Sequence, residues 1–371
     1  MLGLTLLSVR KVSSVKQVFL SRLEPMIRQT AELHQDANGL EADTSLSQAE
    51  IKELRNALPE EAFEPAPKRL IILFVHAVLV ACGFYFAGHT KSAMALILFG
   101  TIAGHSLAAI GFLSHELTHG VIIRNKQFLF FAEKFFWGIA LVSPTMWRRA
   151  HNQTHHPYLN TPKDCDRRFL ETEKTTFHRW YVFLIYPNAE MFPWNPLIWT
   201  YMNLYFLRNT IAVFLNGGKC IPIVPAMPCY RKGDGRKVML DVLFILAIFC
   251  MLFFVGGFSL IRFSEMIVVS QLVASIIVMA YIFTNHMLNP ITTESDAIGG
   301  STSVIVPAWL DWLHTHYSYH TEHHVFPTLN SDYYPQLSLL LQKRFPDKYR
   351  RIPIRDAWRQ LWKTPPFASV R

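Results

Sequence analysis

Four stretches of the chain contain no Lys, Arg, Asp or Glu over nearly the length of a membrane-spanning helix. They are residues 70–90, 92–114, 242–261 and 266–284. A helix that crosses about 30 Å of hydrocarbon at about 1.5 Å per residue needs roughly 20 apolar residues. The pattern therefore predicts four transmembrane helices.

These four stretches come in two pairs with very short separations. Lys91 separates the first pair, and residues 262–265 separate the second. Each pair therefore predicts a helical hairpin that returns to the side of the membrane it left. We predict an all-α integral membrane protein with an N-terminal region (1–68) and a membrane domain (69–371). The hydrophilic segments 115–241 and 285–371 form a helical cap on the same side as the N-terminal region.

Composition and charge support a membrane protein and indicate its orientation. Of the 371 residues, 51% are hydrophobic and 17% are charged, which excludes a disordered chain. The net charge is +9, and Lys and Arg are concentrated in the three hydrophilic segments. The positive-inside rule places these segments in the cytoplasm. Topology and anionic lipid then account for the basic residues without a nucleic-acid partner.

Half of the 16 histidines fall into three tight clusters. The clusters are His115 and His119; His151, His155 and His156; and His320, His323 and His324. Residues three or four apart share a face of a helix, so each cluster presents imidazoles in one direction, with His156 rotated to an adjacent position. A tetrahedral zinc ion takes about four ligands, so eight imidazoles suit two metal ions. Imidazole binds Zn, Cu, Fe and Ni, and the metal must be inferred from context.

The first cluster alone also fits another class of enzyme. His115-Glu116-x-x-His119 has the HExxH form of zinc metalloproteases, in which the glutamate is the general base. That interpretation leaves six clustered histidines without a role. A non-catalytic membrane scaffold would leave all eight unexplained.

The three clusters resemble the histidine boxes of the membrane fatty-acid desaturase and hydroxylase superfamily in order, spacing and position relative to the hairpins. The flanking segments are similar to those of its acyl-chain desaturase branch; they are Trp147-Arg148-Arg149-Ala150-His151, His155-His156-Pro157-Tyr158 and His323-His324-Val325-Phe326-Pro327. The resemblance implies a cytosolic non-haem centre of two iron ions that uses O2 and two external electrons to attack an unactivated C–H bond. It also implies a ninth histidine ligand at the end of the fourth span, where His286 lies, with Asn285 or Asn289 assisting.

Further residues near the boxes are candidates for supporting roles. Glu116 and Glu322 are expected to orient ligand imidazoles. Trp147, Arg148 and Arg149 are expected to hold the headgroup or thioester end of the substrate, while its alkyl tail occupies an apolar tunnel among the spans.

The sequence contains no GxGxxG dinucleotide motif, CxxCH haem motif or His-Pro-Gly-Gly motif of a fused cytochrome b5. Electrons are therefore expected from a separate carrier such as ferredoxin, rubredoxin or cytochrome b5. The expected activity is desaturation of an acyl lipid or acyl thioester in the bacterial inner membrane or the endoplasmic reticulum. Hydroxylation is the alternative, because both reactions begin with the same hydrogen abstraction.

Overall fold

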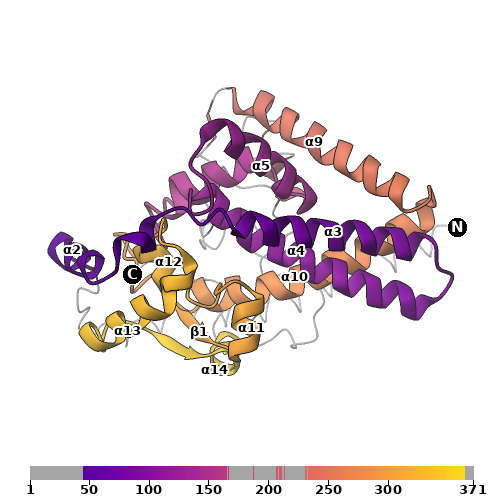
Figure 1. Ribbon diagram of the computed structural model, residues 1–371. Coiled ribbons are helices and arrows are strands. Elements are labelled where there is room, and N and C mark those ends of the chain that lie inside the picture. Colours follow the sequence, from indigo (N-terminus) through magenta and orange to yellow (C-terminus); the bar gives the residue numbers. More distant parts are fainter. Residues whose placement is uncertain are drawn as a thin grey trace, which may run out of the picture. The chain divides into compact units, whose positions relative to one another are not determined.

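The computed structural model describes residues 45–164 and 233–363, together with residues 166, 187, 206, 207, 209, 210, 213, 230 and 231 (Figure 1). The chain divides into two compact units, residues 1–44 and 45–371, and all described residues belong to the second. Most of the predicted N-terminal region thus lies outside the described residues.

Among the described residues, four helices are long and apolar enough to cross a membrane. They are α3 (Arg69–Gly88), α4 (Ala93–Thr118), α9 (Asp234–Val255) and α10 (Leu260–His286). Figure 1 shows α3, α4 and α10 side by side, with α9 along one side of them. The outer helices expose apolar side chains, such as Ile71 of α3 (67% exposed) and Phe254 of α9 (64% exposed). A surface of this kind is suited to lipid, and the prediction of a helical membrane protein is confirmed.

The second hairpin begins and ends at other residues than the charge pattern predicts. The third span runs over Asp234–Val255 instead of 242–261, and α9 ends where Gly257 and Phe258 adopt positive φ angles of 75° and 61°. Asp241 lies inside the helix because its buried carboxylate forms an ion pair with Lys134. A paired charge can be accommodated within a span, so a count of charge-free residues places the start of this helix too late.

A bent helical segment leads from the membrane helices to the second histidine cluster. Helix α5 (Lys126–Ile139) packs beside α9, and the chain then turns through 103° into α6 (Pro144–Trp147) and η2 (Arg148–His155), a π-helix. The carboxylate of Asp241 also accepts a hydrogen bond from Ser143 Oγ at 2.5 Å, so α9 anchors α6 as well as α5.

The remaining described elements lie at one end of the membrane helices (Figure 1). They are α2 (Gln48–Asn56), η1 (Glu60–Phe63), β1 (Ser303–Ile305), α11 (Ala308–Leu313), α12 (His320–Val325), η5 (Ser331–Tyr333), α13 (Tyr334–Arg344), β2 (Arg351–Pro353) and α14 (Ile354–Leu361). The strands β1 and β2 pair in parallel. Leu54 and Leu58 from the N-terminal side share a core with Leu337 and Leu341 of α13. This small core holds α12, which carries the third histidine cluster, against the ends of α4 and α10.

Candidate metal centre

Nine histidines from four elements converge at the end of the membrane helices, in two neighbouring groups. His115, His119, His151, His156 and His323 each place a ring nitrogen within 4.8 Å of the others. His155, His286 and His324 do the same. His320 joins this second group, because its Nε2 lies 2.6 Å from Nε2 of His286 and 3.2 Å from Nε2 of His324. The groups contain five and four imidazoles.

The π-helix η2 explains how two adjacent histidines serve different groups. The amide of His156 donates to the carbonyl of His151 at 3.1 Å, a bond that spans five residues instead of four. His156 therefore lies beside His151, with 3.1 Å between their Nε2 atoms, while His155 packs against His286 and His324. The spacing of an ordinary α-helix did not predict this division.

The geometry of the nitrogen atoms fits metal ions. Two imidazole nitrogens bound at right angles, at a metal–nitrogen distance of about 2.1 Å, lie about 3.0 Å apart. The Nε2 atoms of His115 and His151 are 2.8 Å apart, and those of His156 and His323 are 3.0 Å apart. Nε2 of His119 is buried and has no hydrogen-bond partner among the described residues.

The electrostatics of the site also suit metal binding. Burial lowers the pKa of His119 and of His320 to about 3, so both rings are neutral at physiological pH. Neutral imidazole is the form that binds metals, and iron is among the ions it accepts. The residues present could therefore hold two metal ions, iron among the candidates, with five imidazoles in one group and four in the other.

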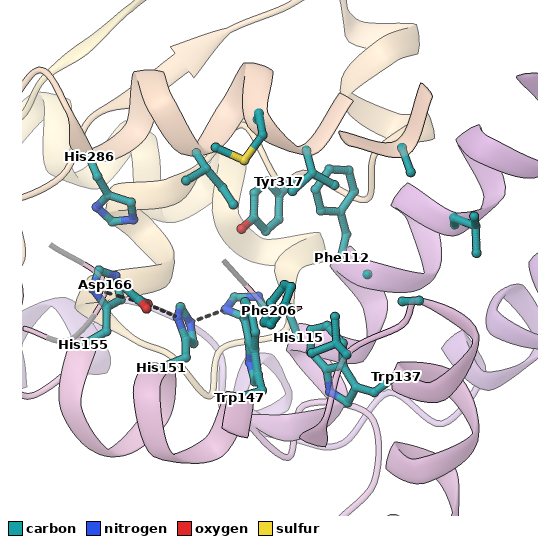
Figure 2. Close-up of a pocket in the computed structure, with 18 of the residues that line it drawn as sticks. Phe112, His115, Trp137, Trp147, His151, His155, Asp166, Phe206, His286 and Tyr317 are labelled. Carbon is teal, nitrogen blue, oxygen red and sulfur yellow. Dashed lines mark hydrogen bonds and ion pairs between the residues drawn. The ribbon is translucent and has the colours of Figure 1, made fainter. Parts of the chain in front are cut away.

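An apolar cavity reaches these imidazoles from between the membrane helices. Figure 2 shows His155 and His286 at one end of it and Phe112 and Trp137 at the other. The cavity contains about 1030 Å³ of space not filled by protein atoms, including its opening to solvent. Side chains of α4 and α10 and the rings of Trp147, Phe206 and Tyr317 line its walls. A long alkyl group could lie along this cavity and reach the metal centre.

Comparison with known proteins agrees with this arrangement. The family model described as fatty acid desaturase matches residues 91–355, which include all nine histidines. This chain belongs to the fatty acid desaturase family. One relative is the sn-1 acyl-lipid omega-3 desaturase (ferredoxin) of Synechocystis sp., 27% identical over 206 residues. That match covers 54% of this chain and 52% of the relative, so it spans about half the length of each.

Two aspartates that the sequence analysis did not single out support the second histidine cluster of this desaturase-family protein. Nδ1 of His155 lies 2.8 Å from Oδ2 of Asp164, which is fully buried and also accepts from the amide of Asn160 at 2.9 Å. Asp166 lines the cavity with its Oδ2 3.5 Å from Nδ1 of His151. The signal in the sequence is two carboxylates that follow the cluster in a short polar segment.

The two predicted glutamates have hydrogen-bond partners other than the imidazoles. Glu116 forms an ion pair with Arg69 at 3.1 Å and accepts from Ser331 Oγ at 2.8 Å. Glu322 accepts from Ser303 Oγ at 2.6 Å and from the hydroxyl of Tyr349, and burial raises its pKa. These contacts fix the helices that carry the first and third clusters.

The two predicted asparagines connect the end of α10 to the segment before β1. The side-chain amide of Asn285 faces the carbonyl oxygens of Tyr281 and Thr302, each at 3.2 Å, so its nitrogen belongs on that side. Asn289 accepts from Thr302 Oγ1 at 3.1 Å and donates to the carbonyl of Asn285 at 3.1 Å. Both residues hold the helix turn that presents His286.

Trp147 borders the cavity, and the adjacent arginines form ion pairs. The indole of Trp147 stacks on the ring of His151, with 4.5 Å between centroids. Arg148 pairs with Glu133 of α5, and Arg149 binds Asp234 of α9 through two hydrogen bonds of 2.8 and 3.0 Å. The two guanidinium groups therefore attach the π-helix to α5 and to the membrane helix α9.

Proposed function

We propose that this protein is a membrane desaturase that introduces a C=C bond into a fatty acyl chain. The supporting observation is an apolar cavity that ends at nine converging imidazoles. The overall reaction removes two hydrogens from adjacent carbons, consumes one O2, two electrons and two protons, and releases two waters. The proposed metal ligands are the nine histidines of the two groups.

When bound, two iron ions would supply the oxidising chemistry that removes hydrogen from an unactivated carbon. The protein's own part is to position the substrate, because an alkyl chain has no polar group near the reacting carbons. The cavity walls hold the chain beside the imidazoles and keep bulk water away from it. Asp164 orients the ring of His155, and Trp147 packs on the ring of His151.

The electrons come from a separate carrier in this proposal. The sequence contains no GxGxxG, CxxCH or His-Pro-Gly-Gly motif, and the name of the Synechocystis relative includes ferredoxin. We therefore infer a ferredoxin as the donor and an acyl lipid as the substrate, with the metal centre on the cytoplasmic side of the membrane. Rubredoxin, cytochrome b5 and acyl thioesters are the alternatives to test beside them.

The metalloprotease interpretation has little support. The carboxylate of Glu116, which would be its general base, is engaged by Arg69 and Ser331. His115 and His119 belong to a group of five imidazoles, more than a single zinc ion takes.

Gas chromatography with mass spectrometry of total fatty acids would test the proposal. A host that also expresses ferredoxin and its reductase would carry the wild type, His323→Ala or His76→Asn. His76 lies in α3 outside both groups, so it is the matched control. We expect a new double bond with the wild type and His76→Asn, and none with His323→Ala. If the new product is a hydroxy acid, the protein is a hydroxylase and the proposal of a desaturase is wrong.

Metal analysis of the same purified proteins gives a second test. Two irons per chain in the wild type, and fewer in His323→Ala, would support the metal centre. One zinc per chain, or no metal, would contradict it.

A further inference from the structure

The walls of the cavity follow one face of each of two membrane helices. On α10 the lining residues Gln271, Ala274, Val278 and Ile282 lead to His286 at intervals of three or four. On α4 Leu107 and Gly111 lead to His115 at intervals of four. Residues with this spacing lie along one side of a helix, so the cavity runs parallel to the helix axes and away from the metal centre.

The cavity ends where α4 and α10 come into direct contact. A Cβ atom added to Gly104 would lie 2.6 Å from the carbonyl oxygen of Ser270, and one added to Gly100 would lie 2.5 Å from Val269. Closer to the metal centre the helices diverge, because a Cβ added to Gly111 would meet nothing within 4 Å. The closed end therefore lies near Leu107 and Gln271.

The depth of the cavity can be measured along its walls. From Leu107 to His115 is eight residues, about 12 Å at about 1.5 Å per residue. From Gln271 to His286 is fifteen residues, about 22 Å. An extended chain advances about 1.2 Å per bond, so the shorter of the two walls accommodates roughly ten bonds beyond the imidazoles.

We propose that this cavity holds the methyl end of the acyl chain and that the new double bond lies near the middle of the chain, with about eight or more carbons beyond it. This inference rests on the proposed function. The tail is assigned to the cavity because the described walls beyond the histidines are apolar apart from Gln271 and the hydroxyl of Tyr317, and could not solvate a carboxyl ester. For an eighteen-carbon chain the reacting carbons are then about the ninth and tenth or nearer to the carboxyl end.

The depth distinguishes this product from that of the relative. An omega-3 double bond leaves two carbons beyond it, about 4 Å of chain, which would fill only a small part of the cavity. A tail that leaves most of an apolar cavity empty forgoes the contacts that hold the reacting carbons in place.

The first test is the position of the double bond. A host that supplies saturated chains of fourteen, sixteen and eighteen carbons would express the wild type with ferredoxin and its reductase, and the products would be mapped by mass spectrometry of dimethyl disulfide adducts. We expect about eight or more carbons between the double bond and the methyl end. A double bond three carbons from the methyl end would overturn this inference and leave the desaturase standing. The absence of any new double bond would overturn the proposed function together with the inference.

The second test shortens the cavity. Gly111→Leu places a side chain in the open space beside Gly111 and should lower the ratio of eighteen-carbon to fourteen-carbon product by about tenfold or more. Gly235→Leu is the matched control, because Gly235 also has nothing within 4 Å of an added Cβ but lies in the first turn of α9, away from the cavity. Iron content equal to that of the wild type would show that Gly111→Leu folds. An unchanged product ratio in an iron-loaded Gly111→Leu would overturn the inference.

Discussion

Nδ1 of His155 lies 2.8 Å from Oδ2 of Asp164, and both side chains are buried. The carboxylate accepts the ring proton at Nδ1, which leaves the lone pair on Nε2 and directs it toward His286 and His324. A carboxylate behind a ligand histidine also raises the basicity of the ring. Asp164 therefore orients a histidine of the second group, although its carboxylate does not face the proposed ion.

Replacing Asp164 should weaken metal binding. We expect Asp164→Ala to lower the iron affinity of one of the two positions by about 10- to 100-fold, because loss of such partners has effects of this size. Iron content after dialysis against a graded series of chelator concentrations measures this. Asp347→Ala, at an exposed position, is the control. Equal iron retention in both variants would contradict the role of Asp164.

The buried ion pair between Arg69 and Glu116 should contribute to stability only as a pair. Arg69 also contacts Asp332 at 2.5 Å, so it joins the first span to η5. We expect Arg69→Met to destabilise the fold by about 3–5 kcal/mol, because it leaves a buried carboxylate without its counter-ion. The double variant Arg69→Met/Glu116→Leu should recover most of this loss. Thermal unfolding in detergent measures both, and a double variant less stable than Arg69→Met would contradict the prediction.

The two arginines of the π-helix should give different phenotypes. Arg149 is 13% exposed and its partner Asp234 only 3%, so Arg149→Ala should cost about 3 kcal/mol of stability by leaving a buried charge unpaired. Arg148 is 38% exposed and can still contact a headgroup. Its partner Glu133 is also buried, but the positive charge of Lys134 still acts on Glu133 in Arg148→Ala. For this variant the sequence's prediction of a higher KM with iron retained therefore stands. Melting temperature and KM of both variants separate the two roles. A raised KM with an unchanged melting temperature in Arg149→Ala would instead support headgroup binding by Arg149.

His314 should make the fold sensitive to acid. Burial and the neighbouring His105 lower its pKa to about 4 from 6.5, while Asp311 opposes the shift, and Nδ1 lies 2.8 Å from the hydroxyl of Tyr281. The ring is neutral in the folded protein but protonated in the unfolded chain between these two pKa values. Above pH 6.5 the His314 ring is neutral in both states and does not lower the free energy of unfolding. As the pH drops toward 4, protonation of the unfolded chain lowers the free energy of unfolding, by about 2 kcal/mol at pH 5.

His314→Gln tests this, because it keeps an oxygen acceptor for Tyr281 and removes the titrating ring. The difference in stability between pH 7.5 and pH 5 should be smaller in the variant than in the wild type. The other histidines are present in both proteins, so the difference in acid response reports the titration of the His314 ring together with its coupling to His105. An equal acid response in the two proteins would contradict the prediction.

Features that depend on neighbours along the chain could be predicted from the sequence. A run of about 20 apolar residues specifies a span whatever packs against it, and the prediction of four spans is confirmed. The resemblance to the desaturase superfamily is confirmed in the same way, because its histidine boxes are local patterns. The metal ligands themselves stay a prediction until an ion is measured.

Features that depend on tertiary partners could not be predicted. In the sequence Asp241 marks the start of a span and Asp164 is one of several loop aspartates. Their partners, Lys134 and His155, are seen only in the structure. Likewise, the sequence shows Arg148 and Arg149 only as basic residues near a membrane surface. The structure shows that they form ion pairs with Glu133 and Asp234. Each of these pairs joins residues from different elements, and a single sequence does not specify such partners.

The wide turn of η2 bears on how the second histidine cluster could vary in length. A π turn accommodates one residue more than an α turn, so His-x-x-x-His-His here occupies the axial space of His-x-x-His-His in an α-helix. Deleting Asn152 or Gln153 would convert one spacing into the other without lengthening or shortening the connection to α6. A single-codon deletion at this point would therefore change the spacing of this histidine cluster and leave the surrounding helices in register.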